Sequence, residues 1–301
     1  MRWFSVPGMD AASQNTTVSL RAGKARATVA LRGAQALAWQ AGGRDLLWTP
    51  DPAVWPDVSP LLFPVVGWTR GGQSRVDGRL YPLALHGFAR HLDYAVLAQG
   101  ADFVRLGIMD TPLTRALYPF AFRLEASYHL TEQGLEMSMV VVNHGDAPMP
   151  YACGFHPGFV WPFAGGAQEN YAIVFDKPEP GHVPVIAASG LIGPTMRDIP
   201  LQHGRLALSP ALFANDALCF LNPASTRLRF AGPTAAIDMA LDNLAHMALW
   251  MRPGGRYLCL EAWSGHSDPE GFVGDLSQKP SMNLLLPGEQ ARHAVSYTFV
   301  A

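Results

Sequence analysis

Short stretches that alternate apolar and polar residues run along the whole chain, separated by clusters of Gly, Pro, Asn and Asp. A period of two residues predicts antiparallel β-strands. The clearest pair spans 122–130 and 135–143, and the four residues between them predict a β-hairpin. Further strands are predicted at 25–32, 102–109, 171–176, 226–232, 247–251, 257–263 and 294–299.

Stretches of helical period are few. Ser209 followed by Pro210 is typical of a cap and first turn, so a short helical turn is expected near 209–216. The 29 Gly and 25 Pro are spread through the sequence, and no linker, repeat or low-complexity segment divides it. We therefore expect an all-β sandwich that forms one domain over residues 1–301.

The composition allows a large core and argues against two kinds of partner. Of the 301 residues, 49% are hydrophobic and only 15% are charged. A formal charge of −2 without a Lys/Arg-rich run speaks against nucleic acid and anionic membranes. No stretch has the pattern of a signal peptide or the length of a transmembrane helix. A cytoplasmic location is expected, and the oligomeric state is left open.

The three cysteines, Cys153, Cys219 and Cys259, are widely spaced and lie in apolar sequence. Their number is odd and there is no Cys-x-x-Cys pair. This pattern predicts buried free thiols rather than a disulfide framework or a zinc site.

Four polar residues interrupt the apolar pattern. His156 follows the extended stretch YACGF and runs into Pro-Gly, and Glu261 lies inside the apolar strand YLCLEAW, where a carboxylate needs a partner or a purpose. His86 precedes Gly87, and Asp216 lies in the segment FANDAL. Each also has a structural interpretation: a turn histidine, a salt-bridged glutamate or an aspartate that caps a turn.

Five segments carry a more specific signal. They are 60-PLLFPVVG-67, 78-GRLYPLALHGFAR-90, 149-MPYACGFHPGF-159, 213-FANDAL-218 and 260-LEAWSGHSD-268. With these five segments in this order, the sequence resembles the aldose 1-epimerase (galactose mutarotase-like) family. It is more similar to the bacterial branch of uncharacterised or hexose-phosphate-type mutarotases. The resemblance extends from about residue 20 to the C-terminus.

The resemblance implies a fold and a set of roles. The fold would be a galactose mutarotase-like β-supersandwich of mostly antiparallel strands with an open cleft, and no cofactor or metal would be used. His156 would be the general acid at the ring oxygen of a sugar, and Glu261 the general base at the anomeric hydroxyl. His86 and Asp216 would bind sugar hydroxyls.

These residue types suit the chemistry of ring opening. One proton must leave the hydroxyl at C1 while another reaches the ring oxygen, and each transfer assisted by a positioned side chain is worth roughly 10²–10⁴ in rate. We expect the two groups on opposite sides of the sugar ring. We also expect an ionised Glu261 and a His156 whose pKa is raised by nearby carboxylates.

The sequence departs from the galactose-type pattern at several positions. Trp68 follows Gly67 where many relatives have arginine, so Arg70 is the candidate for that contact. Ala262 replaces the usual Pro, and Gly158 stands where galactose-type members have Tyr, which points away from a dedicated galactose mutarotase. Trp263 is a candidate platform for the sugar, or a core residue.

The leading hypothesis is therefore a mutarotase that interconverts the α and β anomers of a hexose. Arg70, Arg75 and Arg90 flank the motifs and favour, as an alternative, an anionic substrate such as a hexose 6-phosphate or a sulfonated hexose. A non-catalytic carbohydrate-binding protein on the same fold is the third possibility.

Overall fold

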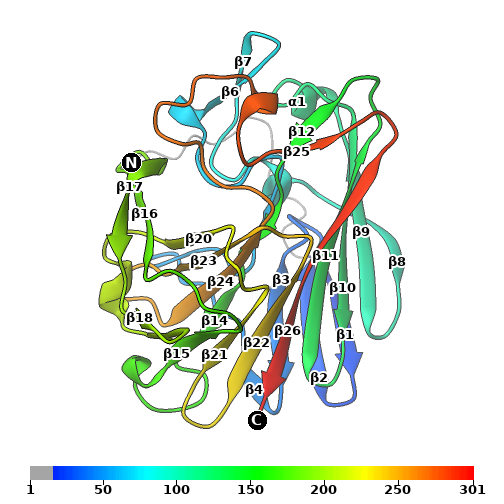
Figure 1. Cartoon of the computed structure of the whole chain (residues 1–301). Coiled ribbons are helices and arrows are strands. Elements are labelled where there is room, and N and C mark those ends of the chain that lie inside the picture. Colours follow the sequence, from blue (N-terminus) through cyan, green and yellow to red (C-terminus); the bar gives the residue numbers. More distant parts are fainter. Residues whose placement is uncertain (1–15) are drawn as a thin grey trace.

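A computed structural model describes residues 16–301 and is almost entirely antiparallel β-structure (Figure 1). Residues 1–15, which include the stretch where no signal peptide was expected, lie outside the described part. The prediction of an all-β sandwich is confirmed. No helix among the described residues is long and apolar enough to cross a membrane.

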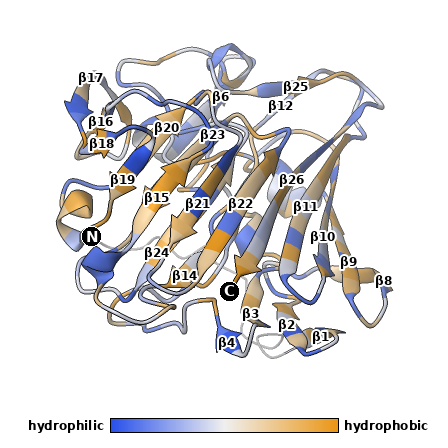
Figure 2. Cartoon of the chain, turned by 60° about the horizontal axis from the view of Figure 1, so that its bottom comes forward, coloured by the Kyte–Doolittle hydropathy of each residue, from blue (hydrophilic) through white to orange (hydrophobic). Residues whose placement is uncertain are grey.

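The largest sheet has ten strands in the order β18-β19-β15-β21-β22-β26-β11-β10-β9-β8. Their bounds are Leu201–Gln202, Arg205–Ala207, Ala172–Phe175, Arg227–Ala231, Ala236–Asp242, Gln290–Val300, Gly134–Asn143, Phe122–Leu130, Phe103–Met109 and Ala95–Gln99. The predicted hairpin is β10–β11, with Leu130 opposite Leu135. Along β10, buried positions alternate with half-buried or exposed ones, as the period of two requires. Figure 2 shows the same mixture of hydrophobic and hydrophilic positions along the strands of this sheet.

A six-stranded sheet carries the candidate site, in the order β20-β23-β24-β13-β5, with β14 also paired to β24. The bounds are Leu218–Leu221, His246–Trp250, Tyr257–Trp263, Gly154–Phe155 and Leu61–Leu62, and Gly158–Val160 for β14. Every residue of β24 is buried, which explains why its sequence is apolar without alternation.

The remaining elements are short. A four-stranded sheet contains β1 (Thr17–Ala22), β2 (Ala25–Ala30), β3 (Ala36–Ala41) and β4 (Arg44–Asp45). Three further pairs are β12 (Met149–Tyr151) with β25 (Asn283–Leu285), β16 (His182–Ile186) with β17 (Ile192–Asp198), and β6 (Gln73–Val76) with β7 (Arg79–Pro82). The helical turns are α1 (Pro112–Arg115) and the 3₁₀ turns η1 (Arg70–Gly72), η2 (Ala89–His91), η3 (Gln168–Asn170), η4 (Pro210–Phe213) and η5 (Leu276–Gln278). The turn expected near 209–216 is η4, although the Ser209 side chain makes no capping hydrogen bond.

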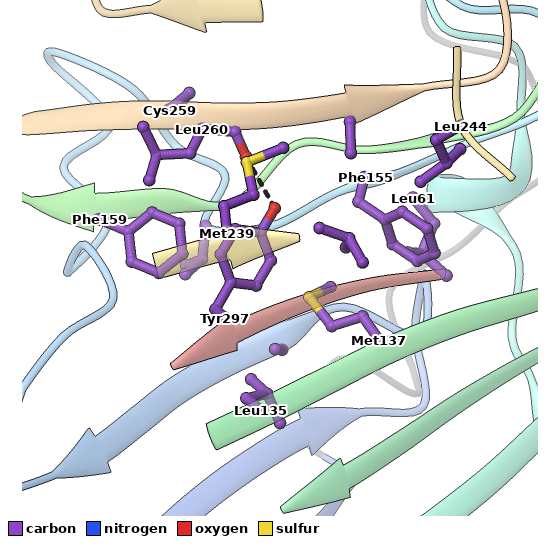
Figure 3. Packing of buried hydrophobic residues seen from close by; sticks show 14 of the residues in the cluster. Leu61, Leu135, Met137, Phe155, Phe159, Met239, Leu244, Cys259, Leu260 and Tyr297 are labelled. Carbon is purple, nitrogen blue, oxygen red and sulfur yellow. Dashed lines mark hydrogen bonds between the residues drawn. The ribbon is translucent and has the colours of Figure 1, made fainter. Parts of the chain in front are cut away.

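The main core lies between the ten-stranded and six-stranded sheets. Figure 3 shows Met239 and Tyr297 of the large sheet packed toward Phe159 and Leu260 of the smaller one. The Tyr297 hydroxyl donates a hydrogen bond to the Leu260 carbonyl at 2.8 Å. This contact fixes one face of β24 against the core, so that the side chain of the next residue, Glu261, lies on the opposite face.

The expectation of buried free thiols is confirmed, because Cys153, Cys219 and Cys259 are buried and unpaired by disulfides.

Candidate active site

His156 and Glu261 are cross-strand neighbours. Phe155 pairs with Ala262 and Gly158 pairs with Cys259, so the register on both sides places His156 opposite Glu261. Pro157 has no N–H to donate, so the ladder of backbone hydrogen bonds to β24 is interrupted there. The Nε2 atom of His156 lies 3.3 Å from Oε2 of Glu261.

The Pro-Gly after His156 interrupts the strand only briefly. The chain resumes pairing with β24 at once, as β14. The local break at His156 and Pro157 separates β13 from β14.

Glu261 has one further hydrogen bond, from the indole N–H of Trp263 to Oε2 at 3.0 Å. The carboxyl is otherwise enclosed, with 1% of the residue exposed. Burial raises the pKa of Glu261 well above its ordinary value; the Trp263 hydrogen bond opposes this shift and the charge of Asp216 adds to it. The structure therefore makes Trp263 a partner of the carboxylate, while its use as a sugar platform stays a prediction.

The environment of His156 differs from the expectation. Burial lowers its pKa to about 3, and the charge of Arg90 lowers it as well, so the expected increase from nearby carboxylates is wrong. The ring packs between Trp55 and Trp250, with centroids at 5.4 and 5.5 Å. An apolar enclosure disfavours the charged form of both His156 and Glu261.

Glu261 and His156 also lie side by side rather than on opposite sides of a space for the sugar. The ring oxygen and the anomeric hydroxyl of an aldose are bonded to the same carbon atom. Two adjacent groups can therefore reach both oxygens, and the expected opposite placement is not needed.

His86 is the third member of the group. Its ring meets the His156 ring edge to face, with centroids 5.5 Å apart. Nδ1 accepts a hydrogen bond from the Gly67 N–H at 3.0 Å, and the His86 N–H donates to the Gly67 carbonyl. These reciprocal bonds assign the proton of the neutral ring to Nε2. His86 is half-buried, and burial lowers its pKa well below its ordinary value.

The first two sequence motifs meet at this point. Phe63 pairs in parallel with Gly87, and Gly87 adopts φ +70°. A Cβ on Gly87 would lie 2.2 Å from the Phe63 carbonyl oxygen, so only glycine fits. The two motifs PLLFPVVG and LALHGFAR therefore meet through the backbone contact of Phe63 with Gly87, and this contact positions the neighbouring His86.

Asp216 lies at the edge of the group, just before β20. It is exposed, has φ +72°, and its carboxylate accepts a hydrogen bond from the Ala217 N–H at 2.7 Å. Arg197 fixes this loop by donating to the Asp216 and Ala217 carbonyls. This bond to the next residue is local and is not a helix cap. Binding of a sugar by Asp216 stays a prediction.

The three arginines are placed differently from one another. Arg70 is exposed and its guanidinium is 3.5 Å from the Phe272 carbonyl, while Arg75 donates to the Gly78 carbonyl inside the β6–β7 hairpin. Arg90 is half-buried, 3.7 Å from Asp57, and near enough to lower the pKa values of His86 and His156. The guanidinium nearest the candidate histidines is therefore that of Arg90, whereas Arg70 was the residue expected from the sequence.

Trp55 and Trp250 were not assigned to the site from the sequence. Trp55 follows a Pro-rich loop, and Trp250 lies on β23 within an ordinary apolar pattern. Neither pattern distinguishes a site residue from a core residue.

One trio of possible metal ligands is present among the described residues: His156, Cys259 and Glu261, whose ligand atoms lie within 4.8 Å of one another. Burial, with the charges of Glu261 and Asp57, raises the pKa of the Cys259 thiol well above its ordinary value. A thiol binds metals as the thiolate, which this environment disfavours.

Two open hollows lie elsewhere on the protein. One, of about 750 Å³, is lined by residues that include Arg79, Arg115 and His144, and another, of about 270 Å³, includes Asn243 and Asn283. Neither is lined by the candidate catalytic residues. We locate the site by its chemistry rather than by volume, because His156 and Glu261 bring an imidazole to 3.3 Å from a buried carboxylate.

The aldose 1-epimerase family profile matches residues 16–177, more than half of the chain. The chain belongs to the aldose 1-epimerase family. The matched segment includes His86 and His156, and Asp216 and Glu261 follow it. The LacX protein of Lactococcus lactis subsp. lactis is 27% identical over 272 residues, covering 86% of this chain and 90% of LacX.

Solved structures of related proteins show the same fold. A galactose mutarotase related enzyme from Lactobacillus acidophilus superposes with a TM-score of 0.87 at 24% identity, covering 95% of this chain and 98% of that one. A galactose 1-epimerase from Lactobacillus acidophilus NCFM gives 0.68 at 15% identity, covering 94% and 93%. The galactose mutarotase-like fold expected from the sequence is confirmed.

Proposed function

We propose that this protein interconverts the α and β anomers of an aldose, with Glu261 and His156 as the acid–base pair. The observation that carries the proposal is their 3.3 Å contact on one sheet face, in an environment that excludes water. Membership of the aldose 1-epimerase family supports an isomerase of this class.

Ring opening then follows from the geometry. Glu261 removes the proton from the anomeric hydroxyl, and His156 delivers a proton to the ring oxygen as the C1–O5 bond breaks. Rotation about C1–C2 presents the other face of the carbonyl. The two transfers run in reverse on closure, so both residues regain their starting states.

The pair needs to hold one proton in total for this cycle. Burial raises the pKa of Glu261 and lowers that of His156, which favours a carboxylic acid beside a neutral imidazole in the ligand-free pair. The pair has the same proton count as a carboxylate beside an imidazolium. Hydrogen bonds from sugar hydroxyls to Glu261 would favour the charged arrangement that starts the reaction.

The remaining site residues would bind the sugar. The Nε2–H of His86 is a donor, and the exposed carboxylate of Asp216 is an acceptor on the other side of Glu261. His86→Ala and Asp216→Ala should each raise KM with little change in kcat, at a cost of about 1–3 kcal/mol for an unpaired polar partner.

An anionic substrate is the less favoured alternative. Arg75 is engaged in its own hairpin, Arg70 is exposed on η1, and Arg90 faces Asp57. A pure binding protein is also less favoured, because a buried acid–base pair is costly and recognition of hydroxyls does not require it.

The experiment is to measure anomer exchange by NMR at equilibrium for glucose, galactose and glucose 6-phosphate, after subtraction of the uncatalysed rate. Enhanced exchange of any of these sugars supports the proposal. Binding of a sugar without any enhanced exchange would replace it with a non-catalytic role.

A further inference from the structure

A second pair of histidines, His246 and His266, lies next to the candidate catalytic residues. On β23, Ala248 is opposite Glu261 and His246 is opposite Trp263. The side chain of His246 therefore shares the sheet face of Glu261, one step further along the strands, with Cα atoms about 7–8 Å apart. The His266 ring follows Trp263 in the chain and meets the His246 ring with centroids 5.1 Å apart.

The two rings present opposite hydrogen-bonding groups. Nδ1 of His246 accepts from the Asn222 N–H at 3.0 Å, which assigns its proton to Nε2. Nδ1 of His266 donates to the Ser267 carbonyl at 2.8 Å, which leaves a lone pair on Nε2. Within residues 16–301, the hydrogen bonds of both rings are made by Nδ1, and none is seen at either Nε2.

The surroundings keep this pair uncharged. Burial lowers the pKa of His246 to about 4, and it also lowers the pKa of His266. The buried ammonium of Lys279, which adjoins His266, is compensated by Asp268 at 3.0 Å. The net charge at the pair is therefore close to zero at neutral pH.

We propose that the Nε2 atoms of His246 and His266 form a hydroxyl-binding subsite for the part of the sugar remote from the anomeric carbon, and that this subsite selects neutral aldoses. The inference rests on the proposed mutarotase function. A hydroxyl donates and accepts at once, so it satisfies both nitrogens.

A phosphate or sulfonate does not fit the same pair. Its oxygens are acceptors at neutral pH, so one of them would face the lone pair of His266. It would also find no uncompensated positive charge, since Lys279 is already paired with Asp268. The exposed fractions of His246 and His266, 4% and 8%, are comparable to the 7% of His156. The proposed subsite is therefore about as buried as the candidate catalytic histidine.

Asparagine substitutions test the subsite with little disturbance. In His246→Asn the amide oxygen takes the place of Nδ1 as acceptor from Asn222, and in His266→Asn the amide N–H takes the place of Nδ1 as donor to Ser267. Each substitution deletes only the far side of the ring with Nε2. The exposed His182→Asn is the matched control.

The readouts are kcat and KM for glucose and its 3-, 4- and 6-deoxy derivatives, with glucose 6-phosphate as the anionic arm. We expect a loss of about 5- to 100-fold in kcat/KM for glucose, carried by KM. For the one deoxy sugar that lacks the bound hydroxyl, wild type and variants should agree within twofold. Wild type should prefer glucose to glucose 6-phosphate.

Different failures have different meanings. An equal loss on every sugar, or a preference of wild type for glucose 6-phosphate, would overturn the subsite while leaving the proposed function intact. Wild type that accelerates exchange of no sugar would overturn the proposed function, and this inference with it. Thermal unfolding of each variant identifies any that fails to fold, and the other variant then decides the question.

Discussion

Replacing Glu261 by Gln isolates proton transfer from structure at this site. Oε2 is the atom that faces both Trp263 Nε1, at 3.0 Å, and His156 Nε2, at 3.3 Å; the amide oxygen can take its place, accept the hydrogen bond from Trp263 and face the His156 ring. The two side chains have nearly the same volume, so the packing around residue 261 is kept. Only the ability to take a proton is lost.

The expected loss in kcat is roughly 10²–10⁴, the usual contribution of one general acid or base. At about 1.4 kcal/mol for each factor of ten, this raises the activation free energy by about 3–5.5 kcal/mol. The stability of the fold should not fall. Glu261 is a buried carboxyl whose pKa is raised by burial, and an amide avoids the cost of its ionisation.

The assay is anomer exchange at equilibrium, measured by NMR with the best sugar of the panel, together with thermal unfolding at pH 7. The exposed Glu169→Gln is a matched control on η3 and should behave as wild type. Exchange at the wild-type rate in Glu261→Gln would refute the assignment of the base. A lower unfolding temperature with proportional loss of activity would instead identify Glu261 as a structural residue.

Three further predictions concern the same pair and its neighbours. His156→Asn should lower kcat by a similar factor of roughly 10²–10⁴. The double variant with Glu261→Gln should be little worse than the poorer single variant, because losses in kcat are not additive for groups that act as a unit. Additive losses in steady-state kinetics would contradict a shared relay. The pH profile of kcat/KM should be broad, because the pair holds one proton between two pH limits. The lower limit lies near the His156 pKa of about 3 and the upper limit is set by the raised pKa of Glu261; both limits belong to the pair rather than to one residue. A loss of activity below pH 6 in protein that remains folded would count against it. The pKa of His246 is depressed in the folded state, so its contribution to stability is complete above the unfolded value of about 6.5 and is lost as pH falls toward 4. The free energy of unfolding should fall by roughly 1.4 kcal/mol per pH unit and by about 3 kcal/mol in all. Denaturant unfolding at pH 7 and 4.5 should show a smaller decrease of this free energy in His246→Asn than in wild type.

The sequence by itself determined the strands and the residue types of the site. The period of two predicted β10 and β11 closely. In β10 one face is buried and the other is half-buried or exposed, whereas the second half of β11 is mostly buried on both faces. The apolar β24 was predicted from its β-forming residues, and Glu261 was identified as the one carboxylate in it. The motif FHPGF identified His156, and the resemblance to a family assigned both roles.

Only the tertiary structure decided how these residues meet. The contact of His156 with Glu261 depends on the register of β13 and β14 against β24, which is set by pairing between segments far apart in the chain. The pKa of His156 is lowered, where an increase was expected, because the ring is buried against Trp55 and Trp250. Burial of this kind is not specified by the local sequence. The approach of His246 to His266 has the same origin. His246 lies outside the motifs, and His266, within LEAWSGHSD, meets it only when β23 pairs with β24.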